Sequence, residues 1–248
     1  MPDQTQQTSL VIADIHLQPN QLQHPINQTF LRFLQQKAIH AQRLYILGDL
    51  FEVWLGDDIG LQQYPTEIQA LKELSNSGTE LYLQYGNRDF LMRKRFQQAS
   101  GVHLLADEYT LTIGDREVLI LHGDQLCTDD IDYQKMRRIF RNPIIQWLFL
   151  HLPKSKRIKI GEKMRQESIQ AGKTKNAEIM DITEEALQAL LQRHPGCTTV
   201  IHGHTHKPAQ HTHHFNGQDY QRYVLSDWRP ATQYLSLTAD GIETHEFE

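Results

Sequence analysis

The sequence predicts a mixed α/β protein in which two sheets form a sandwich flanked by helices. Five short apolar runs, typical of buried strands, recur along the chain, and polar residues directly follow each run. About one strand-helix-strand interval separates the first runs, and amphipathic stretches such as residues 30–34 and 68–74 fill these intervals. The C-terminal part alternates between polar and apolar residues, as the strands of hairpins do.

In chain order, the runs at residues 10–12, 44–47 and 81–83 predict three strands connected by helices. The chain is then expected to change to a hairpin formed by residues 109–113 and 117–121, which flank a Gly-Asp pair.

The next interval, between His122 and His204, is about twice as long and has helical sequence. Pro143 and Pro153 are expected to break it, and residues 181–191 predict a regular amphipathic helix. We therefore expect a helical cap inserted at about residues 130–180.

The tail, residues 211–247, contains Asn216-Gly217, a strong hairpin signal. With 248 residues and 39% hydrophobic side chains, the chain can bury a full core as one large domain or two small ones. We expect residues 1–248 to form a single domain.

Composition also bears on location. No run of about 18 apolar residues exists, and residues 1–9 are polar without a basic stretch. We therefore expect neither a membrane span nor a signal peptide, and a cytoplasmic location. Cys127 and Cys197 are too few for a disulfide framework and are expected to be reduced thiols.

Metal-binding side chains follow the five apolar runs. The stretches are Asp14 with His16, Gly48-Asp49, Gly86-Asn87-Arg88-Asp89, His122-Gly123-Asp124, and Gly203-His204-Thr205-His206. Residues at i and i+2 project to the same side of an extended strand, so each such pair can converge on one point. One fragment alone is weak evidence, because a lone His is usually packed in a core and Gly-Asp usually marks a turn. The ordered set, at the carboxyl ends of strands, predicts a metal site.

The residue types suit two divalent ions about 3.5–4 Å apart that share a bridging anion. We expect Asp49 to be the bridge. The remaining ligands form two sets, namely Asp14, His16 and His206 for one ion, and Asn87, His122 and His204 for the other. Two carboxylates leave a surplus of about two positive charges, which favours an anionic substrate and lowers the pKa of a bound water toward ~7. Mixed nitrogen and oxygen ligands without thiolate suit Mn²⁺ better than a structural zinc.

In their order and spacing, these motifs resemble those of the calcineurin-like metallophosphoesterases: Asp-x-His, Gly-Asp, Gly-Asn-His/Arg-Asp/Glu, His and Gly-His-x-His. The resemblance spans residues 10–206. Finer details resemble the members of this family that act on an acylated UDP-glucosamine in bacterial lipid A synthesis. These details are GDLFE at 48–52 with GDD at 56–58, GNRDF at 86–90, and HGD at 122–124 with CTDD at 127–130.

That resemblance implies attack of activated water on the α-phosphorus, with release of UMP and an acylated glucosamine 1-phosphate. It implies catalytic roles for Arg88, Asn87 and His204. The implied substrate contacts are Asn87, Arg88, Asp130, Arg165, Ser168, Lys175 and His204. Near Ser168 the chain departs from its relatives, because Gly172 stands where a polar Asn can occur, which bears on binding of the head group.

Arg88 indicates which bond is broken. A guanidinium with a pKa above ~12 cannot protonate a leaving group near neutral pH. Cleavage of a phosphoanhydride needs no such acid, and Arg88 could instead stabilise charge on the transferred group. The alternative is a structural ion pair with Asp89 or another neighbour, which does not exclude the first role.

The cap region is unusually basic. Residues 135–165 contain ten Lys and Arg and one acid, Glu162, in a chain with a net charge of −5. Within this region, residues 144–152 are too short to cross a bilayer and apolar on too many sides for an ordinary surface helix. This pattern favours contact with an anionic membrane surface or with an acylated anion. We thus expect peripheral association with the cytoplasmic face of the inner membrane.

Two alternatives remain for this region. The apolar run could pack the cap onto the core while the charges form a solvated face, or the basic side chains could bind nucleic acid. The negative net charge and the lack of interleaved aromatic residues argue against nucleic acid. No obligate protein partner is evident.

Two rival functions also remain. A dinucleotide polyphosphate hydrolase or a cyclic phosphodiesterase would keep the metals but would not need a basic, apolar cap. A non-catalytic scaffold could use the cap to hold a partner, although the complete ligand set argues against it. The other histidines of this part of the chain are expected to support the site or lie at the surface; they are His202, His211, His213 and His214.

Overall fold

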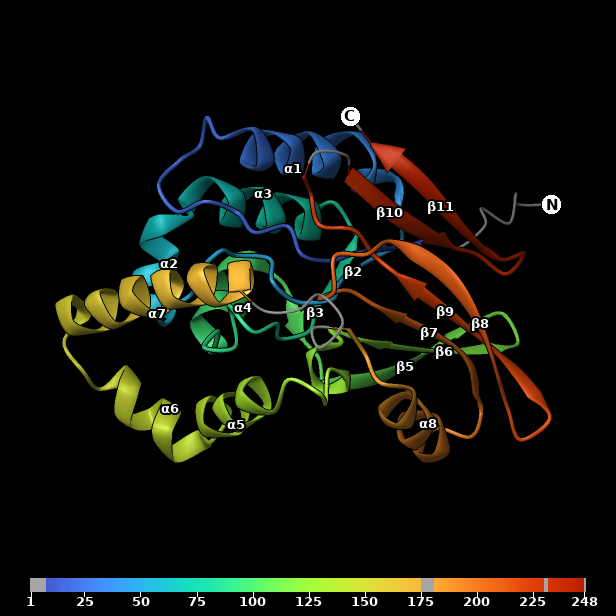
Figure 1. The fold of residues 1–248 in the computed structure, drawn as a ribbon. Coiled ribbons are helices and arrows are strands. Elements are labelled where there is room, and N and C mark those ends of the chain that lie inside the picture. Colours follow the sequence, from blue (N-terminus) through green and yellow to red (C-terminus); the bar gives the residue numbers. More distant parts are fainter. Residues whose placement is uncertain (1–7, 175–180, 230–231, 248) are drawn as a thin grey trace.

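The computed structural model describes residues 8–174, 181–229 and 232–247, which form two β-sheets with helices outside them (Figure 1). The strand order is β11-β10-β1-β2-β3-β4 in the first sheet and β5-β6-β7-β9-β8 in the second. The strands of the first sheet are β1 (Ser9–Ile12), β2 (Arg43–Ile46), β3 (Glu80–Leu83), β4 (His103–Leu104), β10 (Thr232–Leu237) and β11 (Ile242–Phe247). Those of the second sheet are β5 (Glu108–Ile113), β6 (Arg116–Leu121), β7 (Cys197–His202), β8 (Ala209–Phe215) and β9 (Gln218–Val224). The predicted α/β sandwich is confirmed.

Helices connect the parallel strands of the first sheet, as predicted. They are α1 (Pro25–Gln36), the 3₁₀ helix η1 (Ala38–His40), α2 (Asp57–Gln63), α3 (Pro65–Asn76) and α4 (Lys94–Ser100). A proline occupies the first turn of both α1 and α3, where its missing N–H has no helical partner to lose. Helix α1 buries Phe30 and Phe33, and α3 buries Ile68 and Leu71, so each helix covers the sheet with one apolar face.

Apolar side chains from both sheets fill the space between them. Val11 and Tyr45 of the first sheet form one cluster with Val118, Ile120 and Ile201 of the second. This packing brings the carboxyl ends of strands from both sheets to one edge of the sandwich, where ligands commonly bind in α/β folds.

Both predicted hairpins are present in the second sheet. Strands β5 and β6 pair up to Ile113 and Arg116, on either side of the Gly-Asp turn. Strands β8 and β9 are joined by Asn216 and Gly217, whose φ values of 53° and 77° are both left-handed. A two-residue type I′ turn requires this backbone, which explains the Asn-Gly sequence.

Helix α8 (Glu184–Arg193) covers the outer face of the second sheet, where Leu187 and Leu190 pack against Val200. Its predicted start at residue 181 is wrong. The Thr183 side chain accepts a 3.3 Å hydrogen bond from the amide of Ala186 and so caps the helix at that point.

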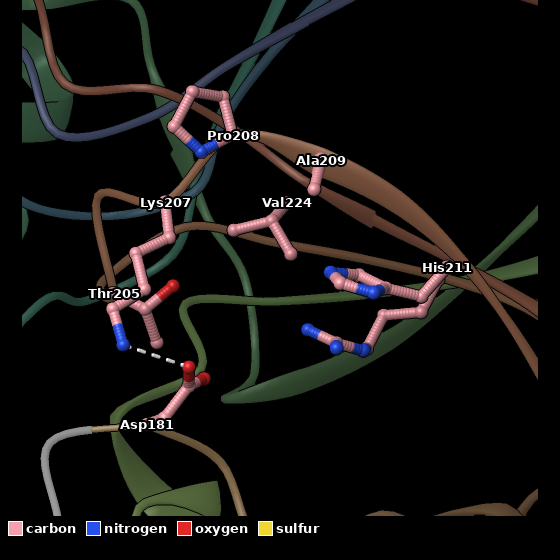
Figure 2. A pocket seen from close by; sticks show the side chains of 8 residues that line it. Asp181, Thr205, Lys207, Pro208, Ala209, His211 and Val224 are labelled. Carbon is pink, nitrogen blue, oxygen red and sulfur yellow. Dashed lines mark hydrogen bonds and ion pairs between the residues drawn. The ribbon is translucent and has the colours of Figure 1, made fainter. Parts of the chain in front are cut away.

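A pocket of about 220 Å³ lies beside β8, lined in part by His211 and Lys207 (Figure 2). Lys207 Nζ lies 2.9 Å from a carboxylate oxygen of Asp181. Arg222 of β9 also lines this pocket and donates to Nε2 of the buried His202 at 3.1 Å. His211 is thus a surface residue and His202 a buried supporting one, as expected.

Three helices lie in the region where a cap is expected, and we call them the cap helices: α5 (Ile131–Phe140), α6 (Pro143–Leu150) and α7 (Lys154–Thr174). They gather at one end of the molecule, away from the β8-β9 turn (Figure 1). Pro143 begins α6, and α7 begins directly after Pro153, so both prolines separate helices as predicted. The 3₁₀ helix η2 (Asp124–Leu126) precedes α5.

Arginines of the cap helices pair with acids of the main fold. The pairs are Arg137 with Asp124 at 2.7 Å, Arg141 with Asp107 at 3.7 Å, and Arg157 with Asp58 at 2.6 Å. Arg157 is only 3% exposed and also donates to the carbonyl of Leu55 at 2.6 Å. The expected basic surface is therefore wrong for these three side chains, since they attach the cap helices to the sandwich.

The apolar run in α6 divides between two environments. Phe149 and Leu150 pack against the main core, as the packing alternative requires. Ile144, Trp147 and Leu148 face solvent, with exposed fractions of 67%, 59% and 51%. The packing alternative therefore holds for part of this run, and the other part exposes apolar side chains on α6.

A span across a bilayer needs about 20 apolar residues in one helix. None of the helices in the described ranges is long and apolar enough to meet that requirement.

Candidate metal centre

The residues of the predicted metal site lie in loops just beyond the strand ends. Strand β1 ends at Ile12 and β7 ends at His202, so the expectation of extended backbone through each i, i+2 pair is wrong. Five site residues instead have left-handed backbone, with φ values of 53° for Asp14, 56° for His16, 50° for Asp49, 68° for His204 and 53° for His206. Residues other than glycine adopt this conformation at a cost, and such strain concentrates at functional sites.

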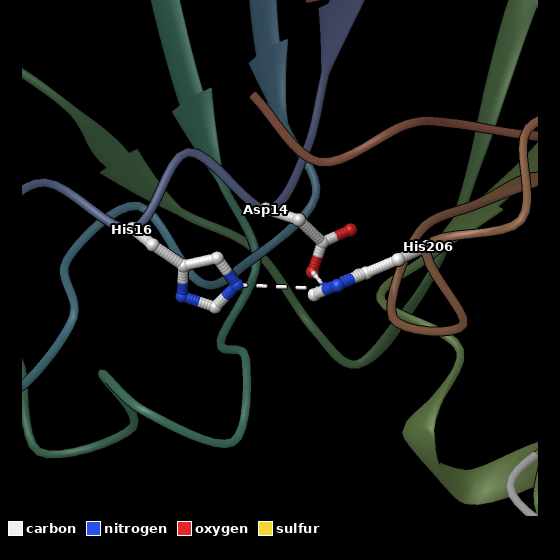
Figure 3. Close-up of side chains that lie close together, drawn as sticks. All are labelled: Asp14, His16 and His206. Atoms are coloured by element: carbon white, nitrogen blue, oxygen red, sulfur yellow. Dashed lines mark hydrogen bonds and ion pairs between the residues drawn. The ribbon is translucent and has the colours of Figure 1, made fainter. Parts of the chain in front are cut away.

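Three side chains from two of these loops form the first group of metal-binding atoms (Figure 3). Nε2 of His206 lies 3.4 Å from Oδ1 of Asp14 and 3.5 Å from Nε2 of His16. Asp14 is fully buried, and its Oδ1 has no hydrogen bond from the described residues. Together these atoms could hold one cation.

The second group surrounds the side-chain oxygen of Asn87. This oxygen lies 3.1 Å from Nε2 of His122 and 3.1 Å from Nδ1 of His204. Asp49 stands between the two groups. Its Oδ1 is 4.0 Å from Nε2 of His122, and its Oδ2 is 3.9 Å from Nε2 of His16. One carboxylate therefore presents an oxygen to each group.

Hydrogen bonds from the surrounding backbone orient these ligands. The amide of His204 donates to Oδ2 of Asp14 at 2.8 Å, and the amide of Arg88 donates to Oδ1 of Asp49 at 2.8 Å. Nδ1 of His122 lies 2.7 Å from the carbonyl of Leu47 and must donate its proton there. The lone pair of His122 is then on Nε2, the atom that faces the site.

Two glycines of the motifs are required because carboxylates of the site lie close to their Cα atoms. A Cβ on Gly86 would overlap the carboxylate of Asp49, and one on Gly203 would overlap that of Asp14. The glycines beside the ligands therefore make room for the carboxylates.

Burial shifts the pKa of the histidines and the pKa of Asp49 in opposite directions. It lowers the pKa of His16 to about 3 and that of His204 to about 4, so both rings are neutral near pH 7 and can offer a lone pair. It raises the pKa of Asp49 to about 7. Burial also acts to raise the pKa of Asp14, but the contact with His206 at 3.4 Å and the other nearby histidines outweigh it, and the net shift is downward.

The donor set fits divalent cations. It consists of carboxylate and amide oxygens and imidazole nitrogens, which suit ions such as Mn²⁺. Ligand atoms of Asp14, Asp49 and His122 also lie close to one another, and Asp49 faces both His16 and His122. The predicted ligands are thus brought together by the fold.

Arg88 and Arg165, two of the implied substrate contacts, converge on one acid. Nη1 of Arg88 lies 3.3 Å from Oε1 of Glu52, and Nε of Arg165 lies 3.0 Å from the same atom. The alternative of a structural ion pair is therefore confirmed, with Glu52 and not Asp89 as the neighbour. The buried carboxylate of Asp89 instead accepts the amides of Leu50 and Gly86 at 2.8 and 2.9 Å.

The other implied contacts lie in or near the cap helices. Asp130 caps α5 by accepting a 3.1 Å hydrogen bond from the amide of Tyr133. Ser168 falls within α7, but its side chain is not among those described, and Lys175 lies outside the described residues.

Sequence reasoning missed two acids near the site. Glu52 stands three residues after Asp49 in the GDLFE stretch, and the fully buried Asp124 accepts from the phenol of Tyr133 at 2.7 Å. The ring of Tyr133 in turn lies 5.7 Å from that of His204. Both acids lie within sequence motifs named above, GDLFE and HGD. That position was the only indication in the sequence that they belong to the site.

A two-sheet α/β fold with paired nitrogen and oxygen ligands at one edge defines a metal-dependent phosphoesterase. Residues 8–208 match the calcineurin-like phosphoesterase family, and the chain belongs to it. Divalent metal ions are the cofactors that this family implies.

Curated relatives cover nearly the whole chain. The UDP-2,3-diacylglucosamine hydrolase of Pseudomonas putida (strain W619) is 44% identical over 96% of this chain and 98% of its own. The protein of the same name from Serratia proteamaculans (strain 568) is 45% identical over the same shares. Among solved structures, an archaeal phosphodiesterase aligns over 97% of this chain and 98% of its own, with 10% identity and a TM-score of 0.47.

Proposed function

We propose that this protein is a UDP-2,3-diacylglucosamine hydrolase of lipid A biosynthesis. It cleaves the diphosphate bond of UDP-2,3-diacylglucosamine and releases UMP and 2,3-diacylglucosamine 1-phosphate. The observation that carries this function is the pair of ligand groups on either side of Asp49, in a chain 44% identical to curated relatives of that name. We further propose that residues 1–248 form one domain with a cap inserted at about 130–180.

The proposed metals are two Mn²⁺ ions. Asp14, His16 and His206 would hold one, Asn87, His122 and His204 the other, and Asp49 would contact both. When bound, two such ions polarise the diphosphate and activate a water molecule at neutral pH. The chain supplies neutral imidazoles at His16 and His204, as their lowered pKa values require.

Three residues are proposed to act on the diphosphate. Arg88 is fixed beside the bridging carboxylate, because its amide donates to Asp49, and its guanidinium can stabilise charge on the transferred phosphoryl group. Asn87 and His204 are proposed to contact the same phosphate while they hold the second ion. The leaving sugar phosphate is a stable anion, so no side chain need protonate it.

The cap helices are proposed to bind the acyl chains and the membrane surface. Ile144, Trp147 and Leu148 expose apolar side chains in α6, and Lys156 of α7 is exposed close by in sequence. Apolar and basic side chains together favour an anionic lipid surface. We therefore propose peripheral association with the cytoplasmic face of the inner membrane, without nucleic acid or an obligate protein partner. In the head-group site, Asp130, Arg165, Ser168 and Lys175 remain proposed contacts.

Product analysis with a set of UDP-sugars tests the function. The protein loaded with Mn²⁺ should release UMP from UDP-2,3-diacylglucosamine, and chelation should abolish the release. In H₂¹⁸O, attack at the α-phosphorus places the heavy oxygen in UMP and none in the sugar phosphate. Heavy oxygen in the sugar phosphate would contradict the proposed site of attack.

A matched substrate comparison separates the rivals. A dinucleotide polyphosphate hydrolase would cleave water-soluble dinucleotides faster than the acylated UDP-sugar, and a scaffold would bind Mn²⁺ without hydrolysing either.

A further inference from the structure

Glu52 occupies a central position between the metal centre and the cap helices. Its side chain is buried, with 8% of the residue exposed, and its amide donates to the carbonyl of Leu17 at 3.0 Å. The preceding residue, Phe51, forms a parallel bridge to Leu17. The backbone of Glu52 is therefore fixed to the loop that carries His16.

The two oxygens of this carboxylate have different neighbours. Oε2 lies 3.4 Å from Nδ1 of His16, a buried atom that makes no hydrogen bond with the described residues, so this is an ion-pair contact. Oε1 lies 3.3 Å from Nη1 of Arg88 and 3.0 Å from Nε of Arg165. One side chain thus contacts the loop after β1, the loop after β3 and the cap helix α7.

A second contact joins the same segments. Nη2 of Arg165 donates to the side-chain oxygen of Gln18 at 3.3 Å, and the amide nitrogen of that side chain donates to the carbonyl of His16 at 2.8 Å. Arg165 therefore reaches the His16 loop by two routes, through Glu52 and through Gln18.

The neighbours of the His16 ring indicate which of its two nitrogens is available to a metal. Nε2 faces His206 and Asp49, at 3.5 and 3.9 Å, so Nδ1 is the nitrogen that points toward Glu52. A carboxylate behind a ligating histidine fixes its tautomer and orientation, and loss of such a partner typically lowers metal affinity about 10- to 100-fold.

The charges around Glu52 do not balance. A single carboxylate faces two guanidiniums, one of which is held next to the bridging Asp49 by its backbone amide. Without the carboxylate, the two cations would repel each other; with it, they lie side by side and retain a positive surplus. A diphosphate dianion fits such a surplus.

We propose that Glu52 is a positioning residue that couples cap helix α7 to the metal centre. It orients His16 through Nδ1, and it holds Arg88 and Arg165 together to receive the diphosphate. The role in substrate binding rests on the proposed function, whereas the roles toward the metal and α7 do not.

Glu52→Gln tests the coupling, because it keeps the shape of the side chain and removes its charge. Isothermal titration of the metal-free protein with MnCl₂ should show an affinity about 10- to 100-fold below that of wild type. Hydrogen exchange of the α7 amides should become faster, since α7 loses an ion pair. With the acylated UDP-sugar, KM should rise and kcat should fall.

Two further variants separate the contacts. Arg165→Gln removes the contacts of α7 with Glu52 and Gln18 and a proposed substrate contact, but it leaves Glu52 beside His16. It should therefore speed exchange in α7 and raise KM while Mn²⁺ affinity stays within about twofold of wild type. Glu52→Asp keeps the charge and should recover part of the Mn²⁺ affinity that Glu52→Gln loses. As a matched control, Glu80→Gln removes a carboxylate paired with Arg43 at 2.9 Å on the first sheet. It should change neither Mn²⁺ affinity nor α7 exchange.

Two outcomes would overturn the proposal. Mn²⁺ affinity of Glu52→Gln equal to wild type would refute the orientation of His16, and unchanged α7 exchange would refute the coupling to the cap. Both measurements are made without substrate. If wild type failed to hydrolyse the acylated UDP-sugar, the proposed function would fail while these two results still decided the role of Glu52.

Discussion

The carboxylate of Asp14 accepts a hydrogen bond of 2.8 Å from the backbone amide of His204, which joins the first metal-binding motif of the chain to the last. The same carboxylate presents its other oxygen to Nε2 of His206 at 3.4 Å. One oxygen therefore fixes the distant loop while the other remains directed into the site. This close approach leaves no room for a side chain at Gly203.

Gly203→Ala should consequently damage the site. The added methyl group would overlap the Asp14 carboxylate and the side chain of Ala13, so one of the two loops must shift. We expect a loss of about 1–3 kcal/mol in the free energy of unfolding, as for overpacked cores, and a marked drop in Mn²⁺ affinity. Gly241→Ala is the control, because nothing surrounds that position, and it should stay within about 0.5 kcal/mol of wild type. Normal Mn²⁺ binding by Gly203→Ala would contradict this account.

The charge of Asp49 should make the metal-free protein sensitive to pH. Burial raises the pKa of this carboxyl to about 7, whereas an unfolded Asp titrates near ~3.9. The folded protein thus retains a proton that the unfolded chain has released. The resulting stabilisation is complete below pH ~3.9 and is lost as the pH rises through about 7. Denaturant unfolding at pH 5 and pH 8, compared with Asp49→Asn, should reveal this loss in wild type alone.

Metal binding should show the converse dependence. A divalent cation must displace the Asp49 proton, so apparent Mn²⁺ affinity should rise by up to about tenfold per pH unit below pH 7 for each proton released. The pKa of His122 is also raised, because the nearby carboxylates outweigh its burial, and its proton adds to the same trend. A pH-independent affinity in calorimetric titrations would contradict the role of Asp49 as a ligand.

Removal of the bridge gives a stronger test of the dinuclear site. Asp49→Ala takes away the carboxylate that faces both ligand groups, and turnover should fall by several orders of magnitude while the fold persists. Circular dichroism checks the fold and metal analysis checks the ion content. Near wild-type turnover by a folded, metal-free variant would exclude the mechanism.

Much of this site could be predicted, because its ligands are of a few chemical types and follow apolar strands in a fixed order. The backbone conformation at those ligands could not be predicted. Left-handed φ at Asp14 and His206 is imposed by contacts between loops nearly 200 residues apart, and an i, i+2 spacing looks the same in a strand and in such a loop.

The sequence also could not show which distant residues pair with the charged side chains. The basic residues of the cap region look alike in the sequence, yet Arg157 is buried against Asp58 whereas Lys156 is exposed. The role of Glu52 depends on three segments that meet only in the folded chain.

Arg88 should stabilise charge and not transfer a proton. Arg88→Ala should lower kcat/KM strongly without adding or removing a basic limb in the pH-rate profile, since a guanidinium does not titrate in that range. Arg88→His should not restore the rate on the diphosphate substrate. Full rescue by His together with a new titrating limb would show that the leaving group needs a proton.

The exposed side chains of α6 should recognise the acyl chains of the substrate. Replacing both Trp147 and Leu148 with Ser removes apolar contact worth about 1.5–3 kcal/mol per fully buried side chain in the complex, so kcat/KM for the acylated UDP-sugar should fall sharply. Stability should change little, because 59% and 51% of these residues are exposed in the free protein. Binding to anionic vesicles should weaken, and salt should weaken it further.

Substitution of the neighbouring Phe149 distinguishes an effect on recognition of the acyl chains from an effect on folding. Phe149 packs against the main core, so Phe149→Ser should lower the melting temperature, whereas the Trp147/Leu148 double variant should not. A UDP-sugar without acyl chains should be a slow substrate for wild type and the double variant alike, because neither can use apolar contacts with it. Equal hydrolysis of acylated and non-acylated UDP-sugars by wild type, unchanged by the double substitution, would refute acyl recognition and return the chain to the water-soluble phosphoesterases.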